Sequence, residues 1–422
     1  MRKLADVQAR RGLRVRERNV LPAASSKSLS SLMAALLFVF VAVLSCGAAR
    51  AAEPLEIRIG VMTHKAPPPA LYELDPTPED EAVAGAGLAI DDNNTTGRFS
   101  GQRYVLDQTV LDKGQSPVEA AVRLADAGAK FLVVALTADE LLAVADALKG
   151  RPVLVFNAAA QDDRLRGADC RANLFHIPPS RAMLTDALVQ YLATKRWMKL
   201  FLTFGPTGAD KLYADALKQS AKKFGLTLVA EKAWEFGPLA RARGDSITQS
   251  DALVFSRGVD YDIMVVADEE ADFGDYLGYR TWDPKVIAGT QGLIATSWHR
   301  AQDAWGSAQL QSRFFKRAKR TMRPIDYQAW VAVRAVGEAV TRTKSADPAA
   351  ISAFLVDPKF QLAAFKGVPV SFRGWDHQLR QPVLIAQPMA IVSVSPQPGY
   401  LHQRSVLDTL GADQPESQCH LP

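Results

Sequence analysis

The chain has 422 residues, of which 48% are hydrophobic and 23% charged, and it contains only 3 cysteines. This composition excludes a disordered chain, a collagen-like fibre and a mini-protein held together by disulfides, and the length corresponds to two or three domain-sized units. The formal charge of +5 comes from residues 1–51, which hold nine Lys/Arg and two Asp/Glu, whereas the rest of the chain holds 41 basic and 43 acidic residues. The basic charge therefore does not indicate nucleic-acid binding.

The first 51 residues have the organisation of a secretory signal. A basic stretch precedes an uncharged apolar run over residues 32–44, and Ala49-Arg50-Ala51 then offers small residues at the two positions that a signal peptidase reads. The thirteen apolar residues would span about 20 Å as a helix, less than a bilayer core of about 30 Å. We therefore expect cleavage after Ala51 and export to an oxidising compartment. A lipid anchor on Cys46 is the less favoured alternative.

Strands and helices are predicted to alternate through the first part of the mature chain. Apolar runs predict strands over residues 57–62, 104–110, 131–136 and 152–156. Thr77-Pro78 and the acidic residues after it predict the start of a helix rich in small residues, which Asn93-Asn94 and Gly97 would end. Ser116 predicts the cap of a second helix that stops at Gly128, and a third helix is predicted over residues 137–148.

The same alternation restarts after Pro178-Pro179. Ser180 predicts the cap of a helix that runs to Lys195. Further strands are predicted over residues 200–204, 226–230, 263–267, 286–289 and 293–296, and further helices over residues 209–224, 246–255, 305–320 and 327–343. The last sixty residues are predicted to be mostly extended and broken by prolines.

This alternation predicts an α/β fold with two Rossmann-like lobes, each built on a parallel sheet covered on both faces. Lobe 1 is expected over residues 52–177 with a return at about 297–378, and lobe 2 over residues 178–296 with part of the tail 379–422. The exported chain keeps two cysteines, Cys170 and Cys419. An even pair in an oxidising compartment is interpreted as one disulfide, and two free thiols are the alternative.

Common catalytic and metal-binding motifs are missing from the sequence. There is no phosphate-binding G-x-x-x-x-G-K-[ST], no G-x-G-x-x-G after the first strand and no G-x-S-x-G, and the six histidines do not fall at metal-ligand spacing. The acidic clusters Asp91-Asp92 and Asp268-Glu269-Glu270 are explained more simply as solvated helix ends than as catalytic pairs. Two lobes without catalytic motifs favour a protein that traps a ligand, which would sit at the carboxyl ends of the strands.

The order of these elements resembles the type 1 periplasmic binding proteins of ABC importers, which include the branched-chain amino-acid binders. The resemblance lies in residues 57–62, 152–159 and 327–330. Other segments resemble one branch of that family, the binding component associated with alcohol dehydrogenases that depend on pyrroloquinoline quinone (PQQ): residues 161–167, 169–171, 179–184, 288–293, 374–376, 379–382 and 394–397. The resemblance implies a periplasmic location.

One departure from the family concerns the ligand. Amino-acid binders of this family usually place a glycine and paired Ser/Thr after the third strand, to hold the ammonium and carboxylate groups. Here the position reads Ala135-Leu136-Thr137-Ala138-Asp139, in which Thr137 is the one residue that could serve. A free amino acid is therefore not the expected ligand.

Strand ends and crossovers supply the candidate ligand-binding residues. Trp298-His299-Arg300 places an aromatic face beside two cations, and Arg181 lies by the first crossover, as a planar anionic ligand such as PQQ would require. Packing in the core is the alternative for each tryptophan, and solvation for Arg181. The predicted ligand-binding set is Thr137, Asn157, Ala158, Arg181, Thr203, Asp268, Gln291, Trp298, His299, Arg300 and Tyr327. Further strand-end candidates are Thr63, His64, Lys65, Phe204, Gly205, Glu269 and Thr290.

The sequence thus predicts a monomeric periplasmic binding protein, not an enzyme, that captures PQQ for an ABC importer or for a PQQ-dependent alcohol dehydrogenase. PQQ would be a bound ligand and not a catalytic cofactor. One alternative is a binder of another small metabolite linked to alcohol oxidation, of amino-acid or amide type. A second alternative is a periplasmic adaptor or sensor that traps no ligand.

Overall fold

A computed structural model describes residues 54–69, 75–236 and 252–421. The predicted signal segment and Cys46 lie outside these ranges, and so does most of the helix predicted over residues 246–255. Within the described ranges, no helix has the length and apolar character needed to cross a bilayer.

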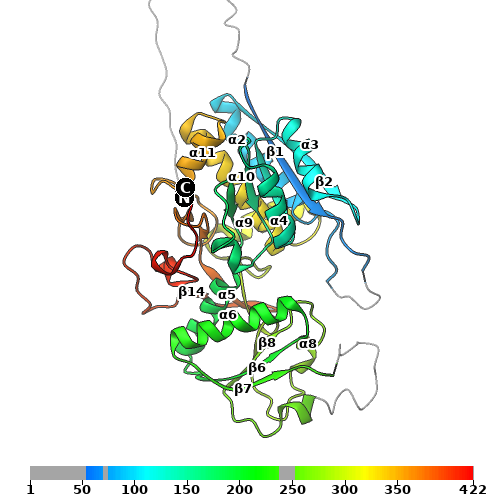
Figure 1. The fold of residues 1–422 in the computed structure, drawn as a ribbon, viewed down its shortest axis with the longest axis vertical. Coiled ribbons are helices and arrows are strands. Elements are labelled where there is room, and N and C mark those ends of the chain that lie inside the picture. Colours follow the sequence, from blue (N-terminus) through cyan, green and yellow to red (C-terminus); the bar gives the residue numbers. More distant parts are fainter. Residues whose placement is uncertain (1–53, 70–74, 237–251, 422) are drawn as a thin grey trace, which may run out of the picture. The chain divides into compact units, whose positions relative to one another are not determined.

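The first sheet has five strands, all parallel, in the order β2-β1-β3-β4-β5 (Figure 1). Four of its strands fall where apolar runs predict them, because a strand buried on both faces needs apolar side chains at nearly every position. The fifth strand was not predicted, since three residues are too few to show a pattern. The strands are β1 (Leu55–His64), β2 (Gln102–Leu111), β3 (Phe131–Ala135), β4 (Leu154–Asn157) and β5 (Leu174–His176).

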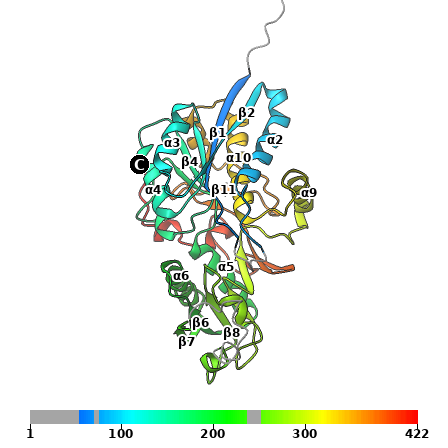
Figure 2. The ribbon, with the colours of Figure 1, turned by 90° about the vertical axis from the view of Figure 1, so that its right-hand side faces the viewer.

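Helices cover both faces of this sheet (Figure 2). Ile59 and Val61 of β1 share a core with α2 (Val83–Ser100) and α10 (Pro324–Thr343) on one face. Met62 of β1 points to the other face, where it packs with α3 (Pro117–Asp126) and α4 (Ala138–Ala147). Successive side chains of a strand point to opposite faces, so β1 joins two separate cores.

The small residues of α2 allow a close approach to α10. A Cβ added to Gly85 would lie 1.9 Å from the carbonyl oxygen of Asp326, and one added to Gly337 would lie 2.3 Å from the Asn93 side chain. The predicted bounds of this helix were wrong. Ala82, and not Thr77, is the cap residue, and the helix continues through Asn93 because the buried Asn93 amide donates to the carbonyl oxygen of Val333 at 3.0 Å.

The second sheet has seven strands in the order β14-β13-β10-β9-β8-β6-β7 (Figure 1). Five of them are parallel, and the tail adds β13 and β14 in antiparallel orientation. The strands are β6 (Lys199–Phe204), β7 (Thr227–Ala233), β8 (Ile263–Ala267), β9 (Ile287–Gly289), β10 (Leu293–Thr296), β13 (Val383–Gln387) and β14 (Ala390–Ser395). Its helices α5 (Arg181–Thr194) and α6 (Gly208–Phe224) start after Ser180 and Thr207, whose hydroxyls each accept a backbone N–H bond in the first turn.

The remaining elements are short or lie mostly in the C-terminal third of the chain. They are α8 (Gly274–Leu277), α9 (Ser307–Ala318), α11 (Pro348–Leu355), the two-stranded sheet of β11 (Ser371–Phe372) and β12 (Leu379–Arg380), and four 3-10 turns (Asp163–Arg166, Ala304–Gly306, Val406–Thr409 and Gln414–Glu416). The short helices α8 and α11 were not predicted. The predicted disulfide between Cys170 and Cys419 is present, with a Cα–Cα distance of 5.7 Å.

The fold class is confirmed, because both sheets are rich in parallel strands and carry helices. The described residues belong to one compact unit, so the boundaries predicted for two lobes stay a prediction.

Candidate functional site

A pocket of about 880 Å³ is lined by residues from both sheets. Its walls include residues at the carboxyl ends of β1, β3, β8 and β9, together with the loop that follows β4. This is the edge at which open parallel sheets bind ligands. The volume lies in the range of small-molecule sites.

Three helices begin at this pocket. Ala138 and Asp139 in the first turn of α4, Arg181 at the start of α5, and Ala209 in the first turn of α6 all line it. The first N–H groups of a helix have no partner within the helix, and the helix dipole favours negative charge at that end. At α5 the first three N–H groups already donate to Gln161, Asp163 and Ser180, so the starts of α4 and α6 are the ones whose backbone can bind an anionic group such as a carboxylate.

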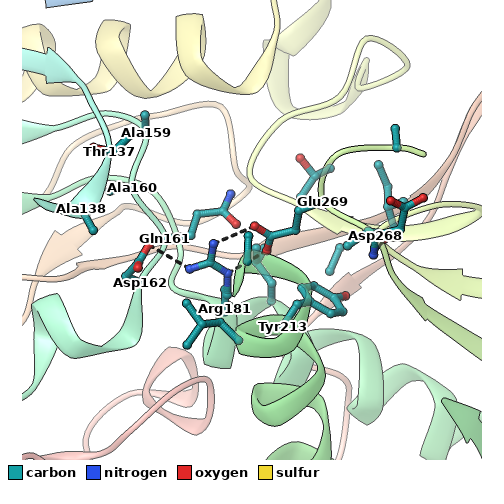
Figure 3. Close-up of a pocket in the computed structure, with 18 of the residues that line it drawn as sticks. Thr137, Ala138, Ala159, Ala160, Gln161, Asp162, Arg181, Tyr213, Asp268 and Glu269 are labelled. Atoms are coloured by element: carbon teal, nitrogen blue, oxygen red, sulfur yellow. Dashed lines mark hydrogen bonds and ion pairs between the residues drawn. The ribbon is translucent and has the colours of Figure 1, made fainter. Parts of the chain in front are cut away.

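Arg181 is held between two carboxylates inside the pocket (Figure 3). Its Nε and Nη2 donate to the two carboxylate oxygens of Glu269, each at 2.7 Å, and its Nη1 donates to Asp162 at 2.9 Å. Burial by itself would lower the pKa of Arg181, but the hydrogen bonds and charges of Glu269 and Asp162 raise it. The guanidinium therefore stays protonated, and its charge is already matched within the protein.

The other charged side chains on the first-sheet wall are also paired. Arg164 bonds to Asp139 and to Asp169. His64 Nε2 lies 2.9 Å from Glu140 Oε1, and the Thr137 hydroxyl donates to the same carboxylate at 2.8 Å. Burial favours a higher pKa for Glu140, but the hydrogen bonds from His64 and Thr137 outweigh it and lower the pKa.

The charges that line the pocket leave it acidic. Four carboxylates line it (Asp139, Asp162, Asp268 and Glu269) against the two guanidinium groups of Arg164 and Arg181, an excess of two negative charges. With anion-binding N–H groups at the helix starts and carboxylates beside them, the pocket offers complementary groups to both ends of a zwitterion.

Asp268, Thr290 and Gln291 shape the second-sheet wall. The Asp268 carboxylate accepts backbone N–H bonds from Asp272, Phe273 and Gly274 at 2.7 to 2.9 Å. Gln291 Nε2 donates to the Asp268 carbonyl oxygen at 2.7 Å, and the Asp268 N–H donates to the Thr290 hydroxyl at 2.8 Å. These bonds fix the backbone that presents Glu269 to Arg181.

Four of the eleven predicted residues line the pocket: Thr137, Arg181, Asp268 and Gln291. Of the further strand-end candidates, His64, Glu269 and Thr290 line it as well, whereas Thr63, Lys65, Phe204 and Gly205 do not. Their part in binding a ligand stays a prediction.

The aromatic residues expected to face a ligand lie in the core instead. Trp298 has no exposed surface and stacks on Tyr327 with ring centroids 4.4 Å apart. The Tyr327 hydroxyl donates to the carbonyl oxygen of Ala364 at 2.7 Å. Neither ring lines the pocket, so neither can stack on a ligand in this conformation. The position of Trp298 after a strand did not reveal its direction, which packing against α10 determines.

Five further candidates also lie away from the pocket lining. Arg300 is exposed and donates to the Pro388 carbonyl oxygen at 3.1 Å, and the His299 ring accepts the N–H of Ala301 at 3.1 Å. Thr203 is fully buried in β6, and Ala158 is fully buried in the core. Asn157 acts indirectly, because its side-chain oxygen accepts the N–H groups of Ala159 and Ala160, which do line the pocket.

Six polar residues of the pocket lining were not predicted: Asp139, Gln161, Asp162, Arg164, Tyr213 and Thr296. Asp162 and Asp139 lie on loops and helix starts, where an acidic residue is ordinarily a solvated cap. Tyr213 lies five residues into α6, and burial, followed by the charge of Glu269, raises its pKa. Asp210 in the same helix had a visible signal, the Thr207-x-x-Asp210 capping pattern; its carboxylate accepts the Glu269 N–H at 2.7 Å. Within the described ranges, no group of three metal-ligating side chains lies close enough to hold a metal ion.

Comparison with known proteins supports the class of fold. A family model described as periplasmic binding protein matches residues 56–244, while no curated protein matches the chain. Among solved structures, the chain is similar to a branched-chain amino acid ABC transporter periplasmic ligand-binding protein from Burkholderia xenovorans LB400, with 17% identity, 80% of this chain and 95% of that chain covered, and a TM-score of 0.65.

Two further solved structures are similar to the same extent. One is the branched-chain amino acid transporter substrate-binding protein of Streptococcus pneumoniae in complex with isoleucine, with 16% identity, coverage of 80% and 98%, and a TM-score of 0.60. The other is the leucine-, isoleucine-, valine-, threonine- and alanine-binding protein of Brucella ovis, with 16% identity, coverage of 80% and 90%, and a TM-score of 0.61. At these identities the similarity shows the fold, which is that of the type 1 periplasmic binding proteins.

Proposed function

We propose that the chain is a periplasmic solute-binding protein, not an enzyme, that captures a small amino-acid- or amide-type metabolite and delivers it to an ABC importer. The observation that carries the proposal is the charge arrangement of the pocket. Its two arginines are already paired with carboxylates, its acidic groups are in excess, and three helices begin at its walls. The similar structures with amino-acid ligands in their names support the same class of solute.

The ligand groups have specific candidates in this pocket. The ammonium or amide N–H groups of the ligand would bind Glu269 and Asp162, in part by displacing Arg181 from one of them. The carboxylate or amide oxygen would bind the first-turn N–H groups of α4 and the freed guanidinium. The paired Ser/Thr hydroxyls that amino-acid binders of the family use are thus not required to hold the ligand. Thr137 is the one residue of this chain at the corresponding position that could serve in that way.

PQQ is a poorer match to this pocket. Three carboxylates need unmatched cations, and a tricyclic ring needs an aromatic face. Trp298 and Arg300 were expected to provide these groups, and both lie away from the pocket lining. The support for a role in an alcohol dehydrogenase system is therefore the sequence resemblance, and not the pocket.

The proposal is tested by a ligand screen of the mature protein. Thermal unfolding is followed with each of the common L-amino acids, with small aliphatic amides and with PQQ, and positive compounds are titrated by calorimetry. We expect at least one amino acid or amide to raise the unfolding temperature and to titrate to saturation. Saturable binding of PQQ alone would overturn the proposed ligand class, and binding of none of these compounds would favour the adaptor alternative.

A further inference from the structure

The loop over residues 161–170, here called the pocket loop, separates the ligand pocket from a second cavity. Gln161, Asp162 and Arg164 line the pocket on its front. Asp163, Arg166 and Gly167 line a cavity of about 710 Å³ on its back, and Arg164 reaches both. The two spaces are separated by the thickness of one loop. A displacement of the loop residues that face the second cavity would therefore move the side chains that face the ligand pocket.

The C-terminal tail, residues 396–421, forms the opposite wall of the second cavity. Gly411, Ala412, Glu416, Ser417 and Gln418 line it. Gln418 packs against the pocket loop, because its Cβ lies 3.9 Å from the position that a Cβ on Gly167 would take. The tail thus covers the back of the pocket loop.

The tail is attached to the helices of the second sheet near Gly411. The Gly411 N–H donates to Asp186 of α5 at 2.8 Å, and Lys223 of α6 donates to the Gly411 carbonyl oxygen at 2.9 Å. Arg373 donates to the Leu410 carbonyl oxygen at 2.7 Å. These bonds hold one end of the segment that faces the pocket loop.

The other end is attached by the disulfide. Within the described part of the chain, the hydrogen bonds of residues 413–419 stay inside the tail, as between His402 Nε2 and Asp413 at 3.0 Å. The bond between Cys419 and Cys170 is then the covalent link that keeps this end on the pocket loop. Without it, residues 413–421 would be held against the pocket loop by packing contacts such as that of Gln418.

Short connections lead from Cys170 to the pocket. The neighbouring Asp169 accepts from Arg164 Nη1 at 2.9 Å, and another nitrogen of Arg164 pairs with Asp139 on the pocket wall. Farther along the loop, Asp162 holds Arg181. A shift of Cys170 is therefore transmitted to two of the carboxylates that line the pocket.

We propose that the Cys170–Cys419 disulfide is a positioning element of the ligand pocket, which fastens the tail against the back of the pocket loop and so sets the location of Asp162 and Arg164. The loop has anchors of its own, since Leu165 is fully buried and Arg166 makes four hydrogen bonds. Loss of the disulfide is expected to loosen the loop without unfolding it. The binding consequence rests on the proposed function, whereas the loosening does not.

The test is amide hydrogen exchange in the ligand-free protein, wild type against the double variant Cys170→Ser/Cys419→Ser. We expect exchange over residues 163–169 to be about threefold or more faster in the variant, with the amides of β8 unchanged as an internal reference. Equal exchange of the loop in both proteins would overturn the proposal. If the variant does not fold, amide exchange of folded wild type is compared before and after a phosphine reductant has cleaved the disulfide. The same outcomes then test the proposal.

A tail variant that keeps the disulfide serves as the control. His402→Ala removes the bond to Asp413 inside the tail, and we expect exchange of the pocket loop to be unchanged in this variant. Faster loop exchange in His402→Ala would assign the effect to the tail as a whole and reject the role of the disulfide. Calorimetric titration with L-isoleucine adds the binding arm. If wild type does not bind L-isoleucine while the loop loosens, the ligand assumption fails and the positioning role stands.

Discussion

The ligand pocket and the buried region where the chain passes between the two sheets use polar side chains in different ways. In this crossing region, Lys366 donates to the carbonyl oxygens of Ser297 and Pro382, and Gln381 donates to that of Ile177 at 2.6 Å. These partners are backbone atoms of three separate chain passages, so the donors join the passages together. In the pocket, Arg181 bonds to side-chain carboxylates that a ligand can replace. The difference teaches that buried donors to backbone carbonyl groups hold the crossing together, whereas the pocket carries ion pairs between side chains, which under the proposed function a ligand would exchange.

The largest effect is expected beside the crossing region, at Asp408. Its buried carboxylate accepts from Arg373 Nε at 2.9 Å and from Arg380 Nε at 2.8 Å. Asp408→Asn leaves two guanidinium groups without their shared carboxylate, and loss of one partner of a buried pair costs about 3–5 kcal/mol. Urea denaturation measures the loss of unfolding free energy. Asp303→Asn, at an exposed position, is the control; equal stability of the two variants would contradict the comparison.

A smaller, pH-dependent effect is expected at Lys366. Burial lowers the pKa of Lys366 to about 7, whereas a lysine in the unfolded chain keeps a pKa of about 10.4. Between these values the unfolded chain holds a proton that the folded chain has lost, so stability rises with pH in this window, by up to about 1.4 kcal/mol per unit. Below pH 7 both states are protonated and the burial penalty is present in full.

Lys366→Met removes this titration. We expect the stability of wild type relative to the variant to increase by roughly 2 kcal/mol between pH 7 and pH 9, measured by urea denaturation at each pH. Parallel pH profiles of wild type and variant would show that Lys366 does not lose its proton in the folded protein over this range, contrary to what its burial implies.

The smallest effect on folding, and the clearest on binding, is expected at Glu269. Glu269→Gln removes the carboxylate that pairs with Arg181, and we expect affinity for an ammonium-bearing ligand to fall about tenfold or more, or about 1.4 kcal/mol. The loss of unfolding free energy should be smaller than for Asp408→Asn, because Glu269 is partly exposed and the buried Arg181 keeps Asp162 as a partner. Glu270→Gln is the matched control, since Glu270 is exposed and lies outside the pocket lining. Equal affinities of the two variants would remove Glu269 from the site.

The sequence predicted most of the fold because hydrophobic pattern and capping act locally. The buried strands β3 and β8 were found from unbroken apolar runs, and α5 was found from the Ser180 cap. Short elements such as β5 and α8 were missed, since three or four residues carry no period. The start of α2 was misplaced at Thr77 because a good capping sequence there is overridden by the packing of the helix on α10.

The location of the pocket was more predictable than the residues that line it, and its role as the ligand site stays a prediction. The rule that ligands lie at strand ends located Thr137, Asp268 and Gln291 on the pocket wall. It failed for Trp298 because the direction of a side chain after a strand depends on tertiary packing, here the stack on Tyr327. It also could not show that Arg181 is matched by Glu269, a residue 88 positions away. That pairing changes the expected ligand from an anion to a zwitterion or amide.

The most direct measurement of the central claim compares a ligand with its two half-charged analogues. Calorimetric titrations of wild type are made with the tightest-binding amino acid, with the same molecule lacking its ammonium group, and with the amine lacking its carboxylate. Because the pocket offers carboxylates to the ammonium group and helix N-termini to the carboxylate, we expect saturable binding of the amino acid. Each analogue should bind at least about tenfold more weakly. Tighter binding of the carboxylate analogue or of PQQ would contradict the account, because it would require an unmatched cation in the pocket.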